Sequence, residues 1–115
     1  MAQASSFTNI KNLYFLVDRN FNVLFNSCTS DTERQLLRQL YVIARDNFWE
    51  ARNRIFIEND PIVTSMNSQL SAINKKITAM ITSYQTVADI LDAISSGVKL
   101  ASSLIVIGSN QGTPA

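Results

Sequence analysis

Apolar residues recur at every third or fourth position through the second half of the chain, from Met66 to Ile105. The gaps between them alternate between four and three residues, which is a heptad repeat. This repeat is typical of a helix that packs lengthwise against other helices. We therefore predict one continuous helix over residues 61–107. The repeat consists of Met66, Leu70, Ile73, Ile77, Met80, Tyr84, Val87, Leu91, Ile94, Val98, Ala101 and Ile105.

The predicted long helix has a clear start and one weak point. Pro61 suits the first position of a helix, and Asp60 before it is a suitable cap. Ser95-Ser96-Gly97 is the one place that favours a kink, because glycine costs about 1 kcal/mol in a helix interior. A kink there would fold the last turns back onto the molecule.

The first part of the chain carries the same apolar spacing, from Phe7 to Cys28. This spacing predicts a helix over residues 6–28 that is capped by Ser5 or Ser6. An alternative is a pair of strands, 14–17 and 21–25, about a turn, because aromatic and β-branched residues suit strands. We favour the helix, since a lone hairpin would have no partner sheet.

A second helix is predicted over residues 31–59. Ser30 and Glu33 have the spacing of a capping box, in which each side chain satisfies a free backbone N–H at the helix start. Apolar positions then follow the four–three rhythm, and Glu50 and Arg54 lie one turn apart, where they can pair. The many charged residues of this segment indicate a solvated outer face.

These segments predict an all-α fold, either an elongated antiparallel helical hairpin or a three-helix bundle, with a long heptad-patterned C-terminal helix. Residues 6–108 would form a single helical domain, with loose ends at 1–5 and 109–115. Lys76 is the only charge at the e and g positions of the repeat, whereas coiled-coil pairs usually carry partner-selecting charges there. The broad apolar stripe therefore favours a bundle over a two-stranded rod.

Geometry predicts an exposed interaction seam at the end of the long helix. Helix 31–59, turning at Pro61, would cover its partner only to about Leu91, and an uncovered apolar edge favours association. Three small residues spaced four apart, Ala93, Gly97 and Ala101, would permit close backbone approach. The predicted interaction seam consists of Tyr84, Val87, Leu91, Ile94, Val98, Ala101, Leu104 and Ile105.

Composition excludes several kinds of chemistry. The chain has no histidine, so a Ser-His or Cys-His nucleophile is excluded, and Cys28 is its only cysteine, which excludes an internal disulfide. The net charge is +1, and basic residues alternate with acidic ones, which argues against nucleic-acid binding. The aromatic cluster Tyr14, Phe15, Phe21 and Phe25 is more typical of a core than of a base-stacking platform. We expect no catalytic residue, no cofactor and no metal.

The resulting expectation is a non-enzymatic helical interaction or assembly protein. It would form a homo-oligomer, or dock on a partner helix, through the predicted interaction seam. The alternative is a membrane-active helical protein, such as a pore-forming subunit, that uses the apolar C-terminal helix. The amino terminus has no pattern of a secretory signal, so we expect cytoplasmic residence, or export by a route that needs no signal.

Overall fold

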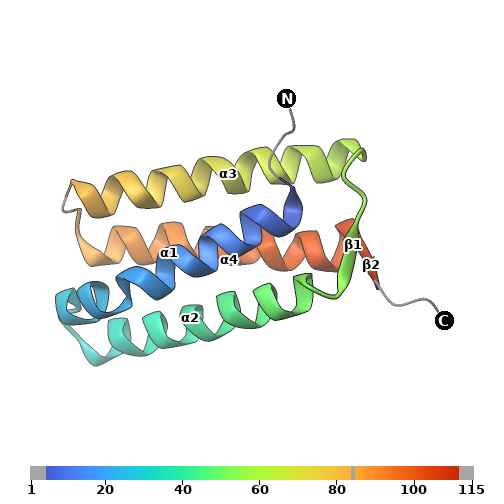
Figure 1. Cartoon of the computed structure of the whole chain (residues 1–115). Helices are drawn as coiled ribbons and strands as arrows, with labels where there is room; N and C mark the ends of the chain where they lie inside the picture. Colours follow the sequence, from blue (N-terminus) through green and yellow to red (C-terminus); the bar gives the residue numbers. More distant parts are fainter. Residues whose placement is uncertain (1–4, 84, 112–115) are drawn as a thin grey trace.

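Four helices lie side by side, with a short two-stranded ribbon at one end (Figure 1). This is a computed structural model that describes residues 5–83 and 85–111. Most of the described residues are helical, and the strands among them are those of the ribbon, so the predicted all-α class is confirmed. The elements are α1 (Ser6–Ser27), α2 (Asp31–Ala51), β1 (Arg54–Phe56), α3 (Pro61–Thr82), α4 (Val87–Gly108) and β2 (Ser109–Gln111).

Successive helices run in opposite directions along the bundle (Figure 1). Helix α4 packs against α1, α2 and α3, and α1 in turn packs against α2 and α3. The described part of the chain measures 47 × 30 × 19 Å, so the molecule is elongated along the helix axes. The ribbon closes the end where α2 and α4 finish and where α1 and α3 begin.

The core is one cluster of buried side chains to which all four helices contribute. Helix α4 supplies the largest share, because it lies against the three other helices and buries apolar residues on more than one face. The buried residues of α4 are Val87, Ile90, Leu91, Ala93, Ile94, Gly97, Val98, Ala101, Leu104, Ile105 and Gly108.

The predicted continuous helix 61–107 is wrong, because the segment forms two antiparallel helices, α3 and α4. Helix α3 ends at Thr82, where both the N–H and the hydroxyl of Ser83 donate to the Ala79 carbonyl, at 2.9 and 2.8 Å. The N–H of Gln85 closes the turn on the Met80 carbonyl at 3.0 Å. Folding back buries the apolar face of α4, which a straight rod would leave in water.

The predicted helix 31–59 is too long, since α2 ends at Ala51 and residues 54–56 form β1. Strand β1 pairs antiparallel with β2. Strand β2 lies in the segment 109–115, which was predicted to be loose. The register places Arg54 opposite Gln111 and Phe56 opposite Ser109. Aromatic and β-branched residues at 55–57 suit a strand, and the pairing gives their backbone groups partners that a frayed helix end would lack.

Three of the four helices begin where the sequence predicts. Ser5 caps α1, and Asp60 caps α3 by accepting the N–H of Ile62 at 2.8 Å. At α2, Ser30 Oγ accepts the N–H of Glu33 at 3.2 Å. The Glu33 carboxylate reaches one residue further back than a standard capping box, to the N–H of Thr29 at 2.7 Å. Segment 6–27 is helical, so the alternative pair of strands is wrong.

Candidate interaction surfaces

The predicted interaction seam lies inside the bundle. Its members in α4 are all buried, and Tyr84 lies outside the described residues. The expectation that this edge extends past its neighbours is wrong, because α4 turns back beside α3 and is covered by α1 and α2 as well. The buried members are Val87, Leu91, Ile94, Val98, Ala101, Leu104 and Ile105.

The three small residues of the seam bring helices together within the chain. Ala93, Gly97 and Ala101 are all buried. A Cβ atom placed on Gly97 would lie 3.1 Å from Leu13 Cδ2 and 3.2 Å from Ile73 Cγ2, so α1 and α3 both approach α4 closely here. Helix α4 continues through Gly97 to Gly108, so the last turns do not fold back at this point.

Five large aliphatic side chains are exposed at the ribbon end of the bundle. They come from β1 and the residue after it, from the start of α3 and from the last turn of α4. Such a gathering is more informative than scattered exposed residues, which are normal on a soluble surface. We call this set the ribbon-end patch: Ile55 (60% exposed), Ile57 (39%), Ile62 (62%), Val106 (77%) and Ile107 (60%).

The ribbon sets the direction of two of these side chains. Successive side chains of a strand point to opposite faces, and Phe56 packs against the core. Ile55 and Ile57 therefore face outward, and the N–H of Ile57 donates to the Gly108 carbonyl at 2.9 Å. Because the sheet has two strands, each strand keeps one open edge among the described residues.

Aromatic side chains fill the contact between α1 and α2. Phe48 stacks on Tyr14 at 5.3 Å between ring centroids. The hydroxyl of Tyr41 donates to Asp18 at 2.8 Å, and its pKa is raised by hydrogen bonding with Tyr14 and then with Asp18. Among the four residues expected in the core, Phe15 is instead exposed. The connected rings are Phe7, Tyr14, Phe15, Phe21, Phe25, Tyr41, Phe48 and Trp49.

A polar network joins α1 to α3 at the ribbon end. The Glu58 carboxylate accepts the N–H of buried Ser6 at 3.1 Å and its hydroxyl at 2.6 Å. Asn67 donates to the same hydroxyl at 2.7 Å and accepts from Asn9 at 3.1 Å. The amide of Asn74 donates to the Asn9 carbonyl at 3.1 Å. These partners are far apart in the sequence, so the sequence alone gave no sign of the network.

A groove runs between α1 and α3 beyond this network. Its first hollow, of about 450 Å³, is lined by Asn12, Phe15, Leu16, Asp18, Arg19, Asn74, Lys75 and Thr78. A second hollow, of about 390 Å³, shares three of these residues and continues toward the ends of both helices. The residues of the second hollow are Leu16, Arg19, Asn20, Thr78, Ile81 and Thr82.

Helix α4 alone among the described helices has the length and hydropathy of a membrane span, with a mean hydropathy of 1.7. Half of this apolar window is buried inside the bundle.

Within residues 5–83 and 85–111, no three His, Cys, Asp or Glu side chains lie close enough to hold a metal ion. Compared with protein-family models, curated proteins and solved structures, the chain matches none of them.

Proposed function

We propose that this protein is a non-enzymatic helical interaction protein that self-associates through the ribbon-end patch. The supporting observation is the gathering of Ile55, Ile57, Ile62, Val106 and Ile107 at one end of the bundle. Leaving such side chains in water forfeits roughly 25 cal/mol for each Å² that burial would remove from solvent. Contact between two such surfaces recovers part of this free energy.

A second copy of the chain is the partner that best fits the patch. All five side chains are uncharged, and the net charge of the chain is only +1, so two copies repel each other weakly. A two-fold contact needs a surface that complements itself, and aliphatic side chains on both copies meet this need. The open edges of the ribbon add backbone groups that an antiparallel strand from a second copy would satisfy.

The solution mass tests this proposal through light scattering behind gel filtration. We expect the wild type to elute as a dimer or larger species, and the double variant Ile55→Lys/Val106→Lys to elute as a folded monomer. Val23→Lys is the matched control. Val23 is 60% exposed, as Ile55 is, but it lies near the end of α1 that is far from the ribbon. A monomeric wild type, or dissociation by Val23→Lys alone, would contradict the proposal.

A second candidate function, membrane insertion, is supported by the composition of α4. This helix is apolar enough to span a bilayer and is covered by three more polar helices, so insertion would require the bundle to open. Flotation with vesicles of zwitterionic lipid, and with vesicles that also contain anionic lipid, tests it. Protein in the lipid fraction with α4 protected from protease supports insertion, and protein that stays with the aqueous fraction for both compositions rejects it.

A further inference from the structure

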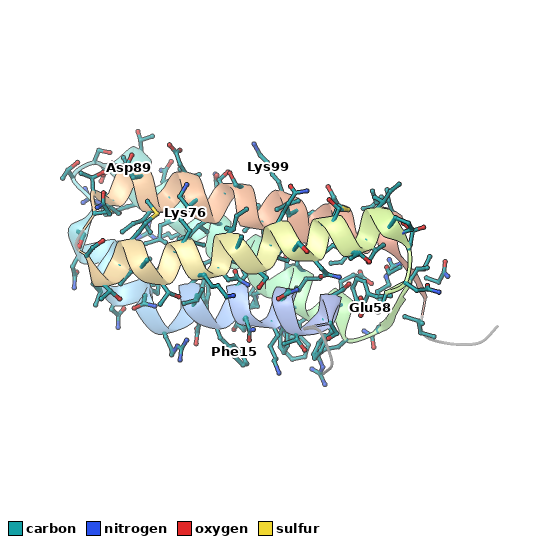
Figure 2. The ribbon with its side chains drawn as sticks, turned by 90° about the horizontal axis from the view of Figure 1, so that it is seen from above. Phe15, Glu58, Lys76, Asp89 and Lys99 are labelled. Atoms are coloured by element: carbon teal, nitrogen blue, oxygen red, sulfur yellow. The ribbon has the colours of Figure 1, made fainter. Side chains whose placement is uncertain are left out.

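The functions proposed above leave the groove between α1 and α3 unused. Its two hollows share Leu16, Arg19 and Thr78, so they form one continuous feature about two helical turns long. Figure 2 shows Phe15 on the α1 side of the molecule, whereas Lys76 lies on the opposite side of α3, toward α4. Lys76 lines a different hollow, with Asp89 and Asp92.

The charges of the groove favour an anion. Arg19 and Lys75 line its first hollow, and neither makes an ion pair within residues 5–83 and 85–111. The acid beside them, Asp18, already accepts the hydroxyl of Tyr41 at 2.8 Å. Two cations and one acid leave one net positive charge, which suits a monoanion better than a phosphate dianion. Arginine also matches the planar geometry of a carboxylate.

The polar wall of the groove also contains an acceptor without a donor. Asn74 lines the first hollow and is only 8% exposed, and its amide group donates to the Asn9 carbonyl. Its Oδ1 atom has no hydrogen-bond partner among the described residues. Buried polar atoms in native proteins nearly always have partners, so an orphaned acceptor in a groove wall calls for an explanation. Oδ1 itself is buried, so an N–H donor from a ligand would satisfy it once the Asn74 side chain rotates toward the hollow.

We propose that this groove binds a small carboxylate that carries an amide N–H, the chemistry of an N-acyl amino acid or of a peptide C-terminus. The carboxylate pairs with Arg19 and Lys75, and the amide N–H donates to Asn74 Oδ1. The apolar part of the ligand lies on Phe15 and Leu16, which line the same hollow. This binding does not involve the ribbon-end patch, which shares only α3 with the groove and lies at its first turn, at Ile62.

Titration of the ¹⁵N-labelled protein with N-acetylphenylalanine tests the proposal. We expect saturable amide shifts in residues 12–20 and 74–82, and none with N-acetylphenylalanine amide, which lacks the carboxylate. A short peptide with a free C-terminus, compared with the same peptide amidated, separates a free metabolite from a partner chain as the source. Shifts with inorganic phosphate that equal those with N-acetylphenylalanine, or no saturable shifts at all, would overturn the proposal.

Matched variants separate binding from folding. Arg19→Gln and Lys75→Gln should each weaken the affinity about tenfold, since each removes one charge-assisted hydrogen bond. Lys76→Gln is the control, because it removes the same charge from the neighbouring residue outside the groove. Asn74→Leu should abolish binding while its urea midpoint changes little, because it removes the unpaired acceptor together with the hydrogen bond to the Asn9 carbonyl. A lower midpoint with unchanged binding would assign Asn74 a purely structural role.

Discussion

At the scale of single residues, the last residue of α4 limits how closely α3 can approach. A Cβ atom on Gly108 would lie 2.9 Å from Val63 Cγ2, and valine is too stiff at χ1 to move away freely. Val63 is itself buried, so the clash cannot be relieved into solvent. This contact explains why a glycine ends α4 where the chain passes into the ribbon.

Gly108→Ala should therefore lower the free energy of unfolding by about 1–2 kcal/mol, a typical cost of overpacking. Urea unfolding measures the change. The double variant Gly108→Ala/Val63→Ala should show coupling between the two sites, because the second substitution removes the clashing methyl groups. Strictly additive effects, or a more stable Gly108→Ala, would show that the backbone of α4 shifts without cost.

Cys28 is a small core residue at the end of α1. It is buried at the C-cap of α1, and its thiol donates to the Leu24 carbonyl at 3.3 Å. Burial, and then the charge of Glu33, raises the pKa of the thiol, whereas Arg34 lowers it. The folded protein thus holds the proton more tightly than the unfolded chain.

The raised pKa of the Cys28 thiol makes the stability of the fold depend on pH in a defined direction. The unfolded thiol titrates near pH 8.5, so above that pH the unfolded state binds fewer protons than the folded state, and stability falls as pH rises. We expect the urea midpoint to fall from pH 8 to pH 10, and to fall less in Cys28→Ala. Iodoacetamide should alkylate the native thiol far more slowly than the urea-unfolded one at pH 8. Equal alkylation rates in the native and the urea-unfolded protein would contradict the burial of the Cys28 thiol.

At the scale of elements, the sequence predicted where helices begin better than where they end. The capping side chains accept N–H groups only two or three residues away, so a short stretch of sequence is enough to predict them. These caps are Ser5, Ser30 and Asp60. The break between α3 and α4 was missed because the apolar rhythm continues across it without a slip. Both helices face one core, and no glycine or proline lies between them in the sequence. Strand β1 was missed because its partner is far away in sequence.

Val98→Asp distinguishes the observed bundle from the predicted long rod. Val98 is buried in α4, so an aspartate there would place a charge in the core without a partner. We expect the free energy of unfolding to fall by about 3 kcal/mol or more, measured by urea denaturation. Lys99→Asp, at the adjacent exposed position, should change it little. A stable Val98→Asp protein with a smaller solution mass would instead place Val98 at an interface between molecules.

At the scale of the whole molecule, the sequence indicated the apolar content of α4 but not which surface remains exposed. Once α4 folds back, the predicted seam becomes core, and exposed aliphatic residues remain at its final turn, at Val106 and Ile107. The groove could not be predicted, because Arg19 and Lys75 come together only through the packing of α1 beside α3. Both surfaces depend on how the hairpin of α1 and α2 packs against the hairpin of α3 and α4.

Glu58 joins these two hairpins at the ribbon end, between α3 and the start of α1 (Figure 2). Glu58→Ala would leave the fully buried hydroxyl of Ser6 without its carboxylate acceptor, and should lower the free energy of unfolding by about 1–3 kcal/mol. Glu58→Gln keeps an acceptor and should cost less. Asp46→Ala, which removes an exposed carboxylate 3.6 Å from Arg45, is the control and should change stability little. Hydrogen exchange should show faster exchange in the first turn of α1 for Glu58→Ala, whereas equal loss of protection along all four helices would mean that Glu58 does not act at this junction.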